Sequence, residues 1–210
     1  MMAERNQLTA GLAAVLMLID HVGAMFFPEQ LVFRLIGRLS FPLFAYGIAQ
    51  GVAHTSDFLK YFFRIFLTAV LSQPIYSMAF RNTNLNPVFT LAYGALVVWL
   101  WRRGKKEKLA AGILLVLSYW LKSSYSWYGV ATIGLFAFYE SAKSVCFYAQ
   151  GALQLVYGCI TGIWAQCLSL CAFPFAGVKW RRRLQLPRYF FYVFYPLHLM
   201  ILVGIRALIF

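Results

Sequence analysis

The stretch LMLIDHVGAMFF, residues 16–27, places a carboxylate and an imidazole side by side, at Asp20 and His21, among apolar side chains. The apolar run starts near residue 8, so it has the roughly 20-residue length of a membrane-spanning helix. An Asp at the centre of such a helix costs roughly 2.5–3.5 kcal/mol on insertion scales. The sequence therefore predicts a membrane helix that carries ionisable groups at a considerable energetic cost.

The composition extends this reading to the whole chain. Hydrophobic residues make up 62% of the 210 residues and charged residues only 12%, whereas soluble domains have about 45–50% and about 25%. Apolar segments follow one another from residue 8 to Phe210 without a long polar stretch, and the first shows no signal-peptide cleavage pattern. We expect one all-α, polytopic integral membrane domain over residues 1–210.

The formal charge of +13 comes from 19 Lys and Arg against 6 Asp and Glu. The basic residues gather in short segments such as RRGKKEK (102–108) and KWRRR (179–183), a pattern that marks the cytoplasmic side of a membrane protein. This reading is favoured over nucleic-acid binding. The cysteines have no zinc spacing and are expected to act as small hydrophobes, so no metal is predicted; they are Cys146, Cys159, Cys167 and Cys171.

Hydrophobic length predicts about nine crossings, with about eight as the alternative. The uncertain region is 141–188, where 144–173 forms either one long helix or two short ones. Both basic segments face the cytoplasm only if 144–173 crosses the membrane twice, with a turn near Tyr157 and Gly158. The resulting nine crossings place the N-terminus in the cytoplasm and the C-terminus outside. The expected helices are 8–27, 31–53, 58–80, 87–101, 109–121, 128–140, 144–157, 159–173 and 189–208.

Several expected helices carry ionisable residues well inside the membrane, which is by default a functional-site hypothesis. Insertion of Asp20, Arg34, Arg38 and Arg64 into the membrane could together cost on the order of 10 kcal/mol unless these side chains are paired or hydrated. Simpler roles stay open: Arg34 could snorkel to the interface, Asp20 could pair with Arg38, and a lone His198 could be a hydrogen-bonded core residue. The residues concerned are Asp20, His21, Arg34, Arg38, Arg64 and His198.

Prolines interrupt the same helices. Pro196 in FYVFYPLHLM (191–200) removes the hydrogen-bond partner of the Tyr192 carbonyl, and Pro42 and Pro74 act similarly in their helices. Carbonyls freed within a membrane must be satisfied by protein or water, which predicts a polar pocket. In such a pocket imidazole is the natural proton-handling group, because its pKa lies near neutral pH.

Six motifs carry a resemblance to a known family. In chain order they are LMLIDHVGAMFFP, LIGRLSFPLFAYGIAQG, YFFRIFLTAVLSQPIY, LNPVFTL, YGVATIGLFAFY and RYFFYVFYPLHLMIL. Together they resemble the TraX family, named after the conjugal-transfer protein that N-acetylates F-type pilin. The resemblance implies a bacterial inner-membrane enzyme, similar in design to membrane acyltransferases of the acyltransferase-3 type.

The resemblance implies acetyl transfer from acetyl-CoA to an envelope amine or hydroxyl, on a pilin-like protein or a glycan. We expect His21 to act as general base, His198 as its partner or alternative, and Asp20 to orient or charge-balance the site. Arg34, Arg38 and Arg64 are expected to bind CoA phosphates or the oxyanion. Weaker candidates for polar contacts, equally suited to kinking and capping helices, are Gln73 and Asn86.

Two other function classes fit the same residues. A proton-coupled transporter or flippase would use Asp20, His21 and the arginines as a relay. A pilus or secretion assembly factor would use the buried charges only for packing. The acceptor, the choice between N- and O-acetylation, and the oligomeric state are not encoded in any motif of the chain.

Overall fold

The computed structural model describes residues 7–178, 186–187 and 189–209. These residues form helices and connecting loops, with one isolated bridge between Leu85 and Ser123. The helices are α1 (Gln7–Phe26), α2 (Leu31–Gly37), α3 (Ser40–His54), α4 (Phe58–Phe80), α5 (Pro87–Trp101), α6 (Lys105–Leu117), η1 (Ser118–Trp120), α7 (Ser126–Phe136), α8 (Lys143–Thr161), η2 (Trp164–Ala172), α9 (Phe173–Ala176) and α10 (Phe190–Ile209). The all-helical prediction is confirmed for the described chain.

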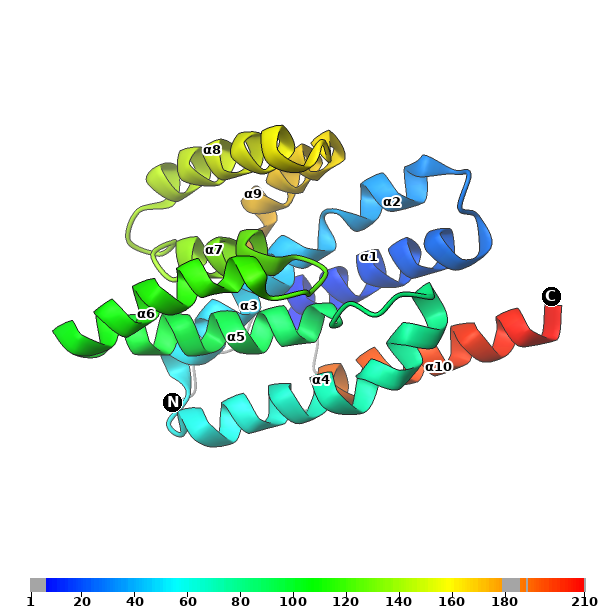
Figure 1. The fold of residues 1–210 in the computed structure, drawn as a ribbon, viewed down its shortest axis with the longest axis horizontal. Helices are drawn as coiled ribbons and strands as arrows, with labels where there is room; N and C mark the ends of the chain where they lie inside the picture. Colours follow the sequence, from blue (N-terminus) through cyan, green and yellow to red (C-terminus); the bar gives the residue numbers. More distant parts are fainter. Residues whose placement is uncertain (1–6, 179–185, 188, 210) are drawn as a thin grey trace.

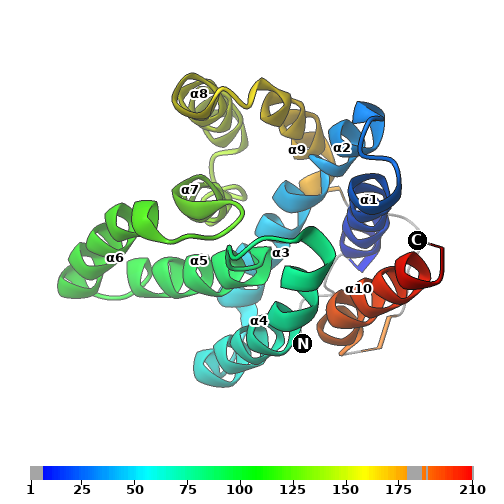
Figure 2. The ribbon, with the colours of Figure 1, turned by 45° about the vertical axis from the view of Figure 1, so that its right-hand side comes forward.

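Helix α3 is the centre of the bundle. It contacts α1, α5, α7 and η2 directly, while α10 packs against α4 and α1, and α8 packs mainly against η2 and α7 (Figures 1 and 2). Small residues of α3, including Ala45 and Ala49, are almost completely buried and allow these close approaches. The Ser40 hydroxyl also donates to the Ala13 carbonyl at 2.8 Å, which ties α3 to α1. The first and last long helices therefore lie next to each other beside the central helix.

The helix expected over 31–53 is broken at Arg38 and Leu39, between α2 and α3. Pro42 explains the position of the break, because its ring collides with the carbonyl four residues earlier, that of Arg38, and offers it no N–H. Gly37, the last residue of α2, lies so close to α1 that an added Cβ would overlap the Asp20 carboxylate. Helix α2 therefore packs on the ionisable part of α1.

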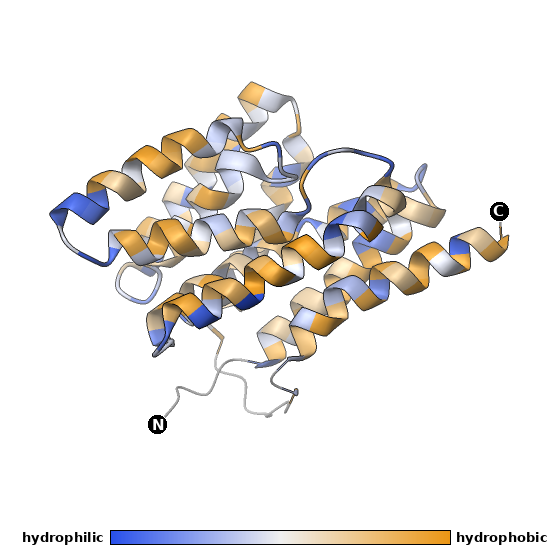
Figure 3. Ribbon diagram, turned by 60° about the horizontal axis from the view of Figure 1, so that its bottom comes forward, coloured by the Kyte–Doolittle hydropathy of each residue, from blue (hydrophilic) through white to orange (hydrophobic). Residues whose placement is uncertain are grey.

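Among the residues that the structure describes, three helical stretches are long and apolar enough to cross a membrane. They are Gln7–Phe26, Leu31–His54, which combines α2 and α3, and Phe190–Ile209; Pro87–Trp101 and Trp164–Ala176 are apolar but shorter. Figure 3 shows hydrophobic residues along the visible helices, with hydrophilic residues concentrated near connections such as the start of α6. The expected number of about nine crossings stays a prediction.

The turn expected near Tyr157 and Gly158 is wrong in its position. Helix α8 continues to Thr161 and ends at Gly162, whose φ of 73° lies in the left-handed region that glycine adopts without strain. Gly158 instead lies within the helix, where it gives room to the Trp164 ring. The next segment is also not the expected α-helix over 159–173, but the 3₁₀-helix η2 followed by α9.

Several predicted helix ends are confirmed by their capping contacts. The Asp57 side chain accepts a hydrogen bond from the Lys60 backbone N–H at 3.0 Å at the start of α4. That N–H and the Lys60 ammonium lower the pKa of this exposed carboxyl. The Asn86 side chain accepts from the Val88 N–H at 3.0 Å, directly before Pro87 in the first turn of α5.

The close approach at Gly37 predicts a specific sensitivity to a single methyl group. We expect Gly37→Ala to destabilise the protein by about 1–3 kcal/mol, because the added Cβ displaces the Asp20 carboxylate from a packed position. Gly47→Ala in α3 is the matched control, since its Cβ meets no atom within 4 Å and alanine favours a helix by up to about 1 kcal/mol. Unfolding in detergent measures both; equal stability of Gly37→Ala and wild type would contradict the packing.

Candidate functional site

The two histidines expected in the membrane, His21 of α1 and His198 of α10, are in direct contact. Their Nδ1 and Nε2 atoms are 2.8 Å apart, and their rings stack with centroids 5.0 Å apart and planes at 9°. Each residue is only 5% exposed. A contact between residues 177 positions apart thus joins the first and last long helices through one buried hydrogen bond.

The neighbouring backbone determines which nitrogen carries each proton. His198 Nδ1 lies 2.7 Å from the Phe194 carbonyl, which can only accept, so His198 is protonated at Nδ1. In the neutral pair His198 Nε2 then accepts, and His21 Nδ1 must donate to it. His21 Nε2 then carries a lone pair that accepts no hydrogen bond from the described residues. The arrangement is a hydrogen-bonded chain that ends in a base, as in a relay in which a second group orients the catalytic imidazole.

Beside this histidine pair, Asp20 forms an ion pair with Arg34. The Arg34 Nη1 and Asp20 Oδ2 atoms are 2.8 Å apart, and the side chains are 35% and 18% exposed. Of the alternatives left open by the sequence, a direct pair of Asp20 with Arg38 is therefore not formed, although Arg38 remains within electrostatic range. The helix break after Gly37 explains the choice, because it places Arg34 of α2 opposite Asp20 and turns Arg38 toward η2. Arg34 forms an internal pair, and not only a snorkelling contact.

Arg38 joins a buried network of amides and hydroxyls. Its Nη1 donates to Gln166 Oε1 at 3.2 Å, and Gln166 Nε2 donates to the Tyr128 hydroxyl at 3.3 Å. The Tyr128 hydroxyl in turn lies 3.1 Å from Ser169 Oγ. The Arg38 Nε atom is buried without a hydrogen-bond partner among the described residues. The network extends to Thr132, Gln150 and Gln154.

Two tyrosines connect these groups and were not predicted from the sequence. Tyr125 stacks on Phe41 with ring centroids 3.8 Å apart and lies within electrostatic range of Asp20 and Arg38. Tyr195 contacts the His198 ring and lies within electrostatic range of Tyr125. The only feature of the sequence that points to Tyr195 is its position one helical turn before His198, and this does not single it out among the 13 tyrosines of the chain. The histidine pair and the arginines thus belong to one neighbourhood.

The three remaining predicted residues lie outside these contacts. Arg64 is on α4, and no hydrogen bond or ion pair described for the structure connects it to the histidine pair; its Nε is buried without a partner there. Gln73 and Asn86 contact each other, with the Asn86 N–H donating to Gln73 Oε1 at 2.9 Å. The Asn86 amide also donates to the Ala69 carbonyl at 2.7 Å, next to the proline in α4. Their arrangement suits the kink and cap alternative, and any binding role remains a prediction.

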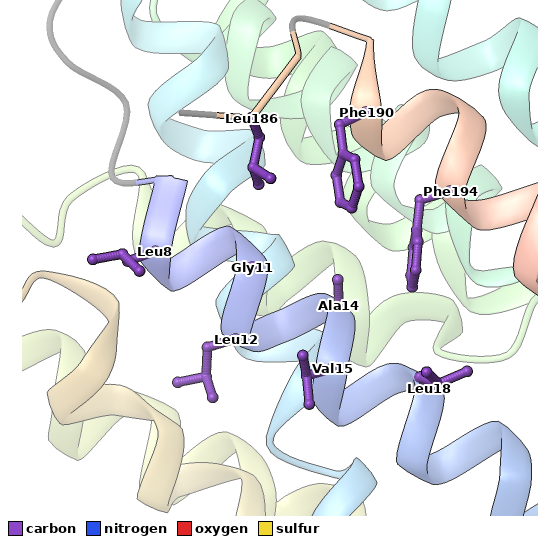
Figure 4. A pocket seen from close by; sticks show the side chains of 9 residues that line it. All are labelled: Leu8, Gly11, Leu12, Ala14, Val15, Leu18, Leu186, Phe190 and Phe194. Atoms are coloured by element: carbon purple, nitrogen blue, oxygen red, sulfur yellow. The ribbon is translucent and has the colours of Figure 1, made fainter. Parts of the chain in front are cut away.

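An apolar hollow of about 480 Å³ lies between α1 and α10 (Figure 4). Phe194, which forms one wall, stacks on the His198 ring with centroids 4.8 Å apart. The full lining consists of Leu8, Gly11, Leu12, Ala14, Val15, Leu18, Leu186, Phe190 and Phe194. Within the described ranges no group of three or more His, Cys, Asp or Glu residues could hold a metal.

These features define a class: an all-helical protein with helices able to cross a membrane and a buried histidine pair beside an arginine cluster. A profile described as "TraX protein" matches residues 5–206, almost the entire sequence. The chain belongs to the TraX family, and the resemblance seen in its six motifs is confirmed.

One curated relative gives this family a biological setting. The chain is 25% identical over 229 aligned residues to the "Probable fimbrial assembly protein FimC, serogroup H1" of Dichelobacter nodosus, and 93% of each chain is covered. The name of this relative describes a fimbrial assembly protein. No solved structure matches the fold.

The Asp20–Arg34 pair predicts an asymmetric response to mutation. We expect Asp20→Asn to destabilise the protein by about 1–3 kcal/mol, because it leaves Arg34 uncompensated; a fully buried pair would cost about 3–5 kcal/mol. The double variant Asp20→Asn/Arg34→Gln should recover part of this loss, since no unpaired charge remains. A double-mutant cycle of unfolding in detergent measures the coupling; strictly additive effects would show that the pair does not interact.

Proposed function

We propose that the protein is a membrane-embedded acyltransferase that moves an acetyl group from acetyl-CoA to an amine or hydroxyl of the cell envelope. The observation that carries the proposal is the His21–His198 hydrogen bond, which leaves a lone pair on His21 Nε2. Acyl transfer requires a base at this kind of position to take the acceptor proton. The family connection with pili supports an envelope acceptor.

The neighbouring charges suit the donor side of the reaction. Two guanidiniums, Arg34 and Arg38, face one carboxylate, Asp20, so the cluster has an excess of one positive charge. Such an excess stabilises an anion, either a phosphate of CoA, the oxyanion or the departing thiolate. Since Gln166 occupies only Nη1 of Arg38, the guanidinium retains donors for a bound group. Arg64 remains a further proposed contact for CoA.

The steps then follow from this geometry. His21 Nε2 takes the acceptor proton while the acceptor nitrogen or oxygen attacks the acetyl carbonyl carbon. His198 Nε2 accepts the hydrogen bond from His21 Nδ1 and so stabilises the imidazolium that forms. Collapse of the tetrahedral intermediate breaks the C–S bond, and the proton returns to the CoA thiolate. Direct transfer is favoured over a covalent intermediate, because no Ser or Cys in the described chain bonds to either imidazole.

The arrangement of connections supports a location for the reaction. We place the protein in the bacterial inner membrane as a multi-pass protein with its N-terminus in the cytoplasm. RRGKKEK covers the α5–α6 connection and the first turn of α6, at the same end of the bundle as the start of α4 and opposite the end of α10 (Figure 1). Lys and Arg in short connections favour the cytoplasmic side, where acetyl-CoA would enter.

Two rival functions make different predictions. An assembly factor that uses its charges only for packing is favoured by the name of the fimbrial relative; it predicts normal pili in a His21→Ala/His198→Ala double variant. A proton-coupled transporter or flippase predicts proton-dependent flux without acyl transfer. Acetyl-CoA binding and acyl transfer by the purified protein separate the enzyme from both.

The histidine pair provides a test with an internal control. We expect His21→Asn to lower acetyl transfer by about 10²–10⁴-fold, the usual contribution of a general base. His54→Asn is the matched control, because His54 also hydrogen-bonds through Nδ1, to the Gln50 carbonyl at 2.8 Å, as His198 does to the Phe194 carbonyl, but lies at the exposed end of α3. Transfer is measured with radiolabelled acetyl-CoA and purified protein supplied with envelope extract. Equal loss in both variants, or none in either, would contradict the assignment.

The acceptor is identified by intact-mass analysis of envelope proteins and glycans from cells with and without this protein. We expect one acceptor to lose the mass of an acetyl group when the protein is absent, and to regain it with wild type but not with His21→Asn. An identical mass profile in all fractions would overturn the enzyme proposal and favour the assembly role.

A further inference from the structure

Tyr195 of α10 has a buried hydroxyl that the described structure leaves unsatisfied. The residue is 5% exposed, and its hydroxyl has no hydrogen-bond partner there. Leaving a buried polar group without a partner costs roughly 1–3 kcal/mol, and within a membrane lipid supplies no substitute. A phenylalanine would fill the same space without this cost. The hydroxyl therefore needs an explanation other than packing.

Tyr195 is buried next to His198, one member of the histidine pair. Its ring meets that of His198 edge to face, with centroids 5.7 Å apart at 64°. The hydroxyl lies within electrostatic range of those of Tyr76 and Tyr125, and Tyr125 in turn lies within range of Asp20. Tyr195 thus faces the interior of the bundle, beside His198 and toward Tyr76 and Tyr125, and not the lipid side of α10.

Two other tyrosines of the same core have hydroxyls that the protein satisfies. The Tyr76 hydroxyl lies 2.5 Å from Ser124 Oγ, and the Tyr128 hydroxyl lies 3.1 Å from Ser169 Oγ. Both are satisfied by the protein itself. Tyr195, in contact with His198, has a hydroxyl without a hydrogen-bond partner among the described residues, so its donor remains available to a bound group.

We infer that the Tyr195 hydroxyl is a catalytic hydrogen-bond donor to the oxyanion of the tetrahedral intermediate; this role rests on the proposed acyl transfer. When the acceptor attacks, its bond to the acetyl carbon forms, the C=O π electrons move to oxygen, and His21 Nε2 holds the acceptor proton. The Tyr195 O–H donates to this oxygen without transferring its proton. The C=O bond re-forms as the C–S bond breaks, and the proton held by His21 passes to the departing sulfur.

A donor to the oxyanion and a purely structural tyrosine respond differently to loss of one oxygen. We expect Tyr195→Phe to lower kcat for acetyl transfer by about 10²–10³-fold, as loss of a single oxyanion donor does, with KM for acetyl-CoA nearly unchanged. Stability in detergent should be unchanged or higher, since the variant removes an unsatisfied buried hydroxyl. Tyr192→Phe on the same helix is the control and should retain wild-type kcat and KM.

Purified full-length wild type, Tyr195→Phe and Tyr192→Phe are compared with radiolabelled acetyl-CoA and envelope extract. If wild type transfers acetyl and Tyr195→Phe keeps its kcat, the role of Tyr195 is overturned while the proposed function stands. A loss of kcat accompanied by a clear loss of stability would also overturn it, because the hydroxyl would then be structural. If wild type itself transfers no acetyl group, the proposed function falls and the role of Tyr195 with it.

Discussion

The buried hydrogen bond between His21 and His198 is the constraint around which the rest of the site is arranged. Within a membrane bundle an imidazole must find its partner in the protein, because lipid offers none. His21 and His198, which are far apart in the sequence, satisfy each other's hydrogen-bonding groups, so α1 and α10 have to lie side by side with these two residues at the same level. The Phe194 carbonyl then determines the tautomer of His198, and through it that of His21. One contact thus sets both the packing of two helices and the position of the proposed base.

The charged groups around this bond follow the same rule of internal satisfaction. Asp20 is paired by Arg34, and Arg38 is held by Gln166 from a segment 128 residues away. Pro42 and Gly37 make these contacts possible, the first by ending α2 and the second by allowing α2 to approach the Asp20 carboxylate. Residues without ionisable groups therefore determine which charges meet.

Much of this arrangement could be predicted from the sequence, because the relevant signals are local. Hydrophobic length gave α1, α4, α5 and α10 almost to the residue, and the cost of intramembrane charge pointed to His21, His198 and Asp20. The partner of Asp20 could not be predicted, since it depends on the angle between α2 and α3 after the break. Tyr195 and Gln166 were missed because a single buried tyrosine or glutamine has no spacing pattern. The turn after α8 was misplaced because the cytoplasmic preference of Lys and Arg determines only whether the number of crossings between two basic segments is even or odd. The position of the turn is set by Gly162, which ends the helix.

The direct His21–His198 hydrogen bond is tested most directly by ¹⁵N NMR of histidine-labelled protein in detergent, with His54→Asn used to assign the exposed residue. The geometry predicts that both buried histidines are neutral and protonated at Nδ1, with a coupling through the hydrogen bond between His21 Nδ1 and His198 Nε2. Protonation of either buried histidine at Nε2, or two imidazoles without any coupling, would contradict it.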